Sequence, residues 1–193
     1  MIDRSGILEQ TKEFVLAQMA KNDAAHDGAH VFRVVCLAKQ LCGAYPQADS
    51  FRVELLSWLH DVNDDKLLSN VGQASLADFL QSIGTPQEDA QFVIQALPYI
   101  SYRKYPKLSP EIPLEIRIVQ DADRIDAVGA VGIARTFAYG GAKGRSLADS
   151  LTHFDEKLLL LYDLLNTEEA KRIAKPRYEF LKEFYARFQE ETK

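Results

Sequence analysis

Residues 57–66, "SWLHDVNDDK", bring a histidine and several acidic side chains to the end of an apolar run. His60 and Asp61 follow directly after Trp58 and Leu59. Polar groups at the end of a buried segment cost free energy unless something binds them, and a divalent cation can do so. The segment therefore predicts that other parts of the chain supply further ligands to a metal ion.

Two other segments offer groups of the same kind: "HVFRV" begins with His30, and "QDADRID" contains Asp121 and Asp123. Two imidazoles and two carboxylates suit Mn, Fe, Co, Zn or Ni better than calcium, which prefers oxygen ligands throughout. His60 and Asp61 project about 100° apart on a helix, but their different lengths let both reach one ion at a helix end. The competing interpretation is a hydrogen-bonded core histidine, since the dipeptide His-Asp alone is weak evidence.

Asp121 and Asp123 lie about 200° apart around a helix, so they cannot both face one ion. Asp121 shares the larger apolar face of its segment, and Asp123 shares the opposite side with Ile116 and Val119. Helical phase therefore leaves the choice between the two aspartates open.

The segments that carry these residues have the apolar spacing of three and four that is typical of amphipathic helices. Residues 114–141 form one long helix or two abutting ones, because Gly129 and Gly132 indicate either close packing or a break. We expect Pro176 to kink or interrupt the last helix. No convincing strand pattern is present, so the prediction is an all-α bundle of roughly eight to ten helices. The expected helical segments are 7–21, 30–41, 51–62, 73–83, 85–99, 114–141, 149–165 and 167–191.

The 193 residues contain no linker-like stretch, which predicts a single domain over residues 1–193. Its metal-site motifs lie between residues 26 and 126, and we expect the C-terminal helices, 149–191, to pack on them. No apolar run approaches the ~20 residues of a membrane span, and the first ten residues lack the plan of a signal peptide, so we expect a cytoplasmic protein without membrane contact. Cys36 and Cys42 are interpreted as reduced core residues.

The formal net charge of -5 argues against sequence-independent binding of nucleic acid, which requires a basic face. A small anionic ligand remains compatible with that charge, because a few local cations and a metal ion are enough to bind a phosphate. A homo-oligomer is left open.

The order H…HD…D on separate helices resembles the HD-domain superfamily of metal-dependent phosphohydrolases. The segments "HDGAHVFRV", "LHDVNDDK", "QDADRIDAVGAVGIARTFAYGG" and "LTHFDEKLLLLYDLL" are similar to a bacterial subgroup that includes nucleotide pyrophosphohydrolases. The resemblance implies that His30, His60, Asp61 and Asp123 are the metal ligands, since the superfamily uses the aspartate that precedes a basic and then an aliphatic residue. Asp121 is the alternative ligand. The expected cofactor is a divalent transition metal, Mn²⁺ first, with Co²⁺, Ni²⁺, Fe²⁺, Zn²⁺ or Mg²⁺ as alternatives.

The resemblance implies a phosphohydrolase that acts on a nucleotide. The expected activity is that of a (deoxy)nucleoside triphosphate pyrophosphohydrolase, in which a metal-bound water attacks and pyrophosphate is released. A hydrolase of an alarmone such as guanosine tetraphosphate, or a phosphodiesterase, would use the same metal site. A non-catalytic HD domain that binds a nucleotide is the alternative outside enzymology.

Asp64 and Asp65 resemble the acidic pair that follows His-Asp in the guanosine tetraphosphate hydrolases, where it serves the nucleophilic water. We therefore expect a catalytic role for Asp64 first and Asp65 second. The competing interpretation is a pair of solvated acids at a helix end.

Five residues are candidates for substrate contact. Lys66, Arg103 and Lys157 could bind phosphate, although lysines and arginines on a helical protein are more often solvated. Tyr102 could stack on a base or fill the core. His26 lies four residues before His30, where a substrate contact competes with a role in a turn.

Overall fold

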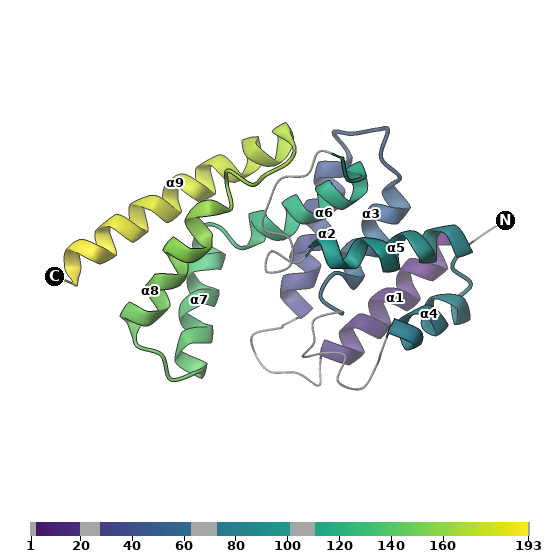
Figure 1. Ribbon diagram of the computed structural model, residues 1–193, viewed down its shortest axis with the longest axis horizontal. Helices are drawn as coiled ribbons and strands as arrows, with labels where there is room; N and C mark the ends of the chain where they lie inside the picture. The colour runs from purple at the N-terminus through teal and green to yellow at the C-terminus, as the bar shows by residue number, and fades with distance from the viewer. Residues whose placement is uncertain (1–2, 20–27, 63–72, 101–110, 193) are drawn as a thin grey trace.

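The chain folds into nine α-helices and one short 3-10 helix, with no β-strand, over the residues that the computed structural model describes, which are 3–19, 28–62, 73–100 and 111–192 (Figure 1). This confirms the predicted all-α class and its range of eight to ten helices. The elements are α1 (Arg4–Met19), α2 (Gly28–Cys42), α3 (Ser50–Leu59), α4 (Gln73–Ser82), α5 (Gln87–Ile100), α6 (Leu114–Asp126), α7 (Ala130–Ala142), α8 (Leu147–Glu156), η1 (Leu158–Leu160) and α9 (Glu168–Glu191).

Helix α3 is the central element of the N-terminal part, and seven of its ten residues are buried. It begins at Asp49, whose Oδ1 accepts hydrogen bonds from the amides of Phe51 at 2.9 Å and Arg52 at 3.3 Å. This cap satisfies amides that have no partner inside the helix. Helices α1, α2, α5 and α6 pack around α3. The C-terminal end of α3 therefore delivers His60 and Asp61 to the interior, as the sequence predicted.

Helices α2 and α6 pack side by side (Figure 1). Helix α2 buries residues at spacings of three and four, including His30, Val34 and Leu41. Helix α6 buries Ile118 and Ile125 against the same core. This packing places the first turn of α2 beside the last turn of α6, although the two turns are more than 90 residues apart in the chain.

The chain turns sharply between α6 and α7 because two glycines allow close approach. Gly129 has a φ of 85°, which lies in the region that favours glycine. A Cβ atom on Gly132 would stand 1.9 Å from the carbonyl oxygen of Ala127. Of the two interpretations of residues 114–141, the structure therefore forms two abutting helices.

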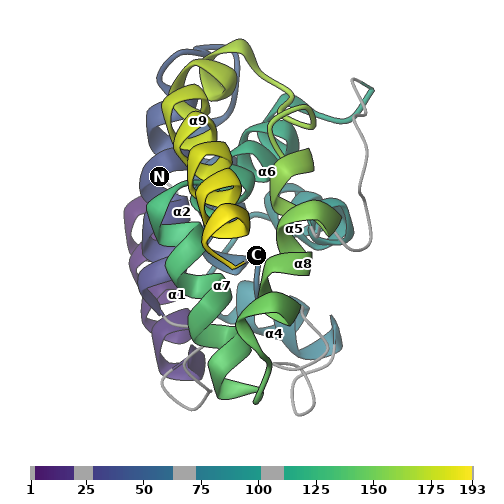
Figure 2. The ribbon, with the colours of Figure 1, turned by 90° about the vertical axis from the view of Figure 1, so that its left-hand side faces the viewer.

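Helices α7, α8 and α9 enclose a second apolar cluster that includes Ile133, Phe154, Leu161 and Leu181. These helices lie to one side of α1–α6 in Figure 1, and Figure 2 looks onto them with α9 in front. The first turns of α9 also join the main core. Of the two expectations for Pro176, a kink or an interruption, the interruption is wrong, because α9 runs continuously through it. Pro176 is exposed, so the carbonyl that loses its helical partner faces solvent at little cost.

The two cysteines differ in their surroundings: Cys42 is buried and Cys36 is exposed, both with free thiols. The interpretation of Cys36 as a core residue is therefore wrong. Cys36 follows the exposed Phe32 by one helical turn, on the side of α2 that faces solvent. None of the described helices is both long and apolar enough to cross a membrane.

Candidate metal centre

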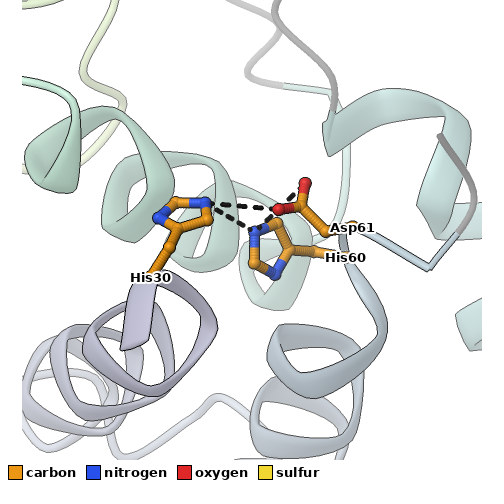
Figure 3. A group of neighbouring side chains, drawn as sticks. All are labelled: His30, His60 and Asp61. Carbon is orange, nitrogen blue, oxygen red and sulfur yellow. Dashed lines mark hydrogen bonds and ion pairs between the residues drawn. The ribbon is translucent and has the colours of Figure 1, made fainter. Parts of the chain in front are cut away.

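His30, His60 and Asp61 point toward one another in the interior (Figure 3). His30 lies in the first turn of α2, and His60 caps the C-terminal end of α3, with Asp61 next to it. The two Nε2 atoms are 3.4 Å apart, and Asp61 approaches His30 Nε2 at 3.4 Å and His60 Nε2 at 3.6 Å. Both histidines are buried. One nitrogen from each ring and one carboxylate oxygen thus gather within 4.8 Å of one another.

These distances suit ligands of a single ion. Ligands held about 2.1 Å from an octahedral ion stand roughly 3.0 Å apart when adjacent, so the observed separations need only a small contraction. If both Nε2 atoms carried a hydrogen, the two N–H groups would repel each other. A cation between the rings would instead be bound by the lone pair of each Nε2 atom. His30, His60 and Asp61 therefore fit a divalent transition metal.

The two candidate aspartates of α6 have different surroundings. Asp123 Oδ1 lies 3.5 Å from His30 Nε2, although Asp123 stays outside the group of three and must approach more closely to join it. Asp121 accepts four hydrogen bonds, two each from Asn166 and Thr167, at 2.7–2.9 Å. Thr167 caps the start of α9, so Asp121 fastens α9 to α6. Asp123 is thus the aspartate that lies next to the predicted ligands.

Each histidine has an acceptor at its other ring nitrogen. His60 Nδ1 lies 2.7 Å from the carbonyl oxygen of Ser57, and His30 Nδ1 lies 2.7 Å from Asp126 Oδ2. A carbonyl or carboxylate oxygen can only accept, so both Nδ1 atoms donate. The lone pair of each neutral ring is then on Nε2, which faces the centre of the group.

Asp126 also binds two arginines. Arg33 donates from Nε at 2.6 Å and from Nη2 at 3.1 Å, and Arg135 donates from Nη1 at 2.9 Å. The Asp126 side chain is only 1% exposed. Burial alone would raise the pKa of this carboxyl, but the hydrogen bonds from His30 and Arg33 lower it well below the ordinary value. Asp126 is therefore a buried carboxylate that stays ionised.

The carboxylates in turn act on His30. Burial lowers the pKa of this imidazole, while the hydrogen bonds to Asp126 and Asp61 and the charge of Asp123 raise it, with a net rise to about 9. In the absence of metal the site therefore attracts positive charge and holds a proton on His30 at neutral pH.

Of the remaining predicted residues, only Lys157 lies in the described part of the chain. His26, Asp64, Asp65, Lys66, Tyr102 and Arg103 lie outside the described residues. Lys157 ends α8, where its amide donates to the carbonyl of His153 at 3.1 Å. Its positive charge helps to lower the pKa of His153, after the larger effect of burial.

The prediction from sequence missed three residues of the centre, namely Arg33, Asp126 and Arg135. Arg33 follows His30 by three residues and Asp126 follows Asp123 by three, so each shares a helix face with a proposed ligand. That spacing was a usable signal. The contact of Arg135 had no comparable signal, because it depends on the direction that the chain takes after the turn between α6 and α7.

No family model matches the chain. Its fold is nevertheless similar to that of an HD-superfamily hydrolase from Bacillus thuringiensis, with a TM-score of 0.77 and 36% identity, over 97% of each chain. The chain is also 39% identical to a curated protein over 183 residues, which is 91% of this chain and 89% of that protein. Together with the histidine and aspartate group, these similarities show that the chain belongs to the HD superfamily.

That curated protein is the uncharacterized protein YpgQ of Bacillus subtilis. The crystal structure of YpgQ in complex with ADP matches this fold with a TM-score of 0.84 and 33% identity in the structural comparison, over 98% of this chain and 97% of that chain.

Proposed function

We propose that this protein is a divalent-metal-dependent phosphohydrolase that converts a nucleoside or deoxynucleoside triphosphate into the monophosphate and pyrophosphate. The observation that carries the proposal is the convergence of His30, His60 and Asp61, with Asp123 beside them. The HD-superfamily relative is named a hydrolase, and YpgQ was crystallised with ADP, which supports a nucleotide as the ligand.

The charges around the centre favour an anionic substrate. Arg33 and Arg135 lie against Asp126 and are each about one-third exposed. Together with a divalent ion, these two guanidinium groups carry more positive charge than Asp61, Asp123 and Asp126 offset. A nucleotide phosphate therefore meets a locally positive site on a protein whose net charge is -5.

His30, His60, Asp61 and Asp123 would hold the ion, and Mn²⁺ is the first choice among the metals that this ligand set accepts. When bound, such an ion lowers the pKa of a water molecule and polarises a phosphate oxygen. Asp64 would orient the attacking water and accept its proton, with Asp65 in a lesser role. Lys66, Arg103 and Lys157 would bind phosphate oxygens, and His26 and Tyr102 would contact the rest of the nucleotide.

The reaction balances without a covalent intermediate. Water attacks the α-phosphorus, the bond from that phosphorus to the bridging oxygen breaks, and pyrophosphate leaves with the bonding electrons. The water proton passes to the Asp64 carboxylate and then to solvent. The substrate class is therefore one that carries a pyrophosphate leaving group.

The direct test is product analysis in ¹⁸O-labelled water. Nucleoside mono-, di- and triphosphates are incubated with Mn²⁺, Co²⁺, Ni²⁺, Mg²⁺ or Zn²⁺, and phosphate and pyrophosphate are measured separately. We expect pyrophosphate from triphosphates alone, with ¹⁸O in the nucleoside monophosphate. The variant His60→Ala is the control for a contaminating phosphatase.

Other outcomes identify other functions. Release of single phosphates, or ¹⁸O in the pyrophosphate, would place the attack at a different phosphorus and reject the pyrophosphohydrolase. Cleavage of guanosine tetraphosphate or of a phosphodiester alone would reject the substrate class. If the protein binds nucleotides but hydrolyses none of them with any of the five metals, the function is that of a non-catalytic nucleotide-binding domain.

A further inference from the structure

We propose that Asp126 is a positioning residue of the metal centre, which sets the nitrogen that His30 presents to the ion and is itself held by Arg33 and Arg135. This inference rests on the metal site of the proposed function but not on the reaction catalysed there. It concerns Asp126 and the two arginines that hold it, to which the proposed reaction assigns no chemical step.

The hydrogen bond between His30 and Asp126 carries the first step. Asp126 Oδ2 lies 2.7 Å from His30 Nδ1, and the carboxylate can only accept. The proton of the neutral imidazole is therefore on Nδ1, and the lone pair on Nε2 is directed at His60 and Asp61. In the opposite tautomer Nε2 would carry the proton and could not bind a metal. Acceptors of this kind raise the basicity of a ligating histidine and fix its orientation.

Asp126 is in turn fixed from two directions. Arg33 comes from α2 and binds both carboxylate oxygens, whereas Arg135 comes from α7 and binds Oδ2. A carboxylate this deeply buried is stable only when such partners compensate its charge. Because α2, α6 and α7 meet at one carboxylate, its oxygens have little freedom to leave His30.

Arg135 lies against both Asp126 and His30. Arg135 Nη1 lies 3.1 Å from His30 Nδ1, but a guanidinium has no acceptor and Nδ1 already donates to Asp126. Arg135 therefore acts on His30 through Asp126, by holding the shared oxygen atom between them.

Helix α6 provides a matched control in Asp121. Asp121 is as fully buried as Asp126 and accepts four hydrogen bonds, but its partners are Asn166 and Thr167 near the start of α9. None of these partners is a proposed metal ligand. Replacing either aspartate by asparagine exchanges one buried carboxyl group of the same helix for an amide, and only Asp126 contacts His30.

The experiment measures the affinity of the folded protein for Mn²⁺, by competition with a chromophoric chelator, without any nucleotide. We expect Asp126→Asn to weaken Mn²⁺ binding about 10–100-fold, the usual range for loss of such a contact. Asp121→Asn should bind Mn²⁺ like the wild type, even if its melting temperature falls as much as that of Asp126→Asn. The ligand-field absorption of bound Co²⁺ should change in Asp126→Asn and stay unchanged in Asp121→Asn.

If Asp126→Asn does not fold, Arg33→Gln and Arg135→Gln replace it, because each removes one support and leaves the His30 contact. Each should weaken Mn²⁺ binding several-fold. Wild-type affinity in both arginine variants, or in a folded Asp126→Asn, would overturn the inference. Equal losses in Asp126→Asn and Asp121→Asn would also overturn it. A wild type whose Mn²⁺ affinity depends on Asp126 but which hydrolyses no nucleotide would reject the proposed function and leave this inference standing.

Discussion

His30 is the residue at which proton and metal compete for the same lone pair. Its pKa of about 9 without metal means that Nε2 carries a proton at neutral pH, which must leave when a cation binds. As pH falls below 9 the proton becomes harder to displace. We therefore expect the apparent metal affinity to fall about tenfold for each pH unit lowered between pH 8.5 and 6.5.

Calorimetry in two buffers of different ionisation enthalpy measures this exchange. Near pH 7 we expect about one proton to be released for each Mn²⁺ bound. Binding that releases no proton would show that His30 is already neutral, contrary to the effect of its three neighbouring aspartates.

Asp64 and Asp65 are adjacent acids with different expected roles. Asp64 follows the proposed ligand Asp61 by three residues, and we assign it to the metal-bound water. Asp64→Asn should keep metal and substrate affinity but lower kcat by about 10²-fold or more, and Asp65→Asn should cost less. Steady-state kinetics of both variants decide the order, and a severe defect in Asp65→Asn alone would reverse the assignment.

At the scale of the elements, the centre depends on helix ends. The first turn of α2, the end of α3 and the last turn of α6 each contribute a ligand or a support. Glycine at position 132 lets the start of α7 approach the carbonyl of Ala127 closely, and this turn places Arg135 on Asp126. The turn between α6 and α7 is therefore part of what shapes the centre.

Gly132→Ala should destabilise the fold, because the new Cβ would meet the carbonyl of Ala127 at 1.9 Å. The clashing atoms belong to the backbone of Ala127, so no flexible side chain can move away, and we expect a loss of about 1–3 kcal/mol, the usual cost of overpacking. Gly141→Ala lies in the same helix with no neighbour within 4 Å and should be neutral or slightly stabilising. Denaturant unfolding of both variants tests this, and equal stabilities would contradict it.

At the scale of the whole molecule, the centre links parts of the chain that are far apart. It joins α2, α3 and α6, and through Arg135 it also reaches the helices around the second apolar cluster. An ion bound there stabilises all of these contacts at once, because the site exists only in the folded chain.

We therefore expect metal to raise the melting temperature. At a free concentration 100 times the Kd, binding contributes about 2.7 kcal/mol if the unfolded chain does not bind. For a chain of this size that corresponds to roughly 5–10 °C. Thermal melts with and without Mn²⁺ measure the shift, and His60→Ala should show almost none. An equal shift in both proteins would place the bound ion elsewhere.

Much of this protein could be read from the sequence because the relevant signals are local. The spacing of apolar side chains predicted the helices, since helical hydrogen bonds join residues four apart. His60 and Asp61 were expected at a helix end, and the structure places them there. The choice of Asp123 over Asp121 came from resemblance, since helical phase left it open.

Only the tertiary structure decided which distant groups meet. Asp121 is taken up by Asn166 and Thr167, and Asp126 lies against His30 from 96 positions away. No local pattern encodes such contacts, because they follow from how α2, α6, α7 and α9 pack. The same reason explains why Cys36 is exposed and why α9 continues through Pro176. Both outcomes depend on which neighbours pack against the residue, and the spacing of apolar side chains does not identify those neighbours.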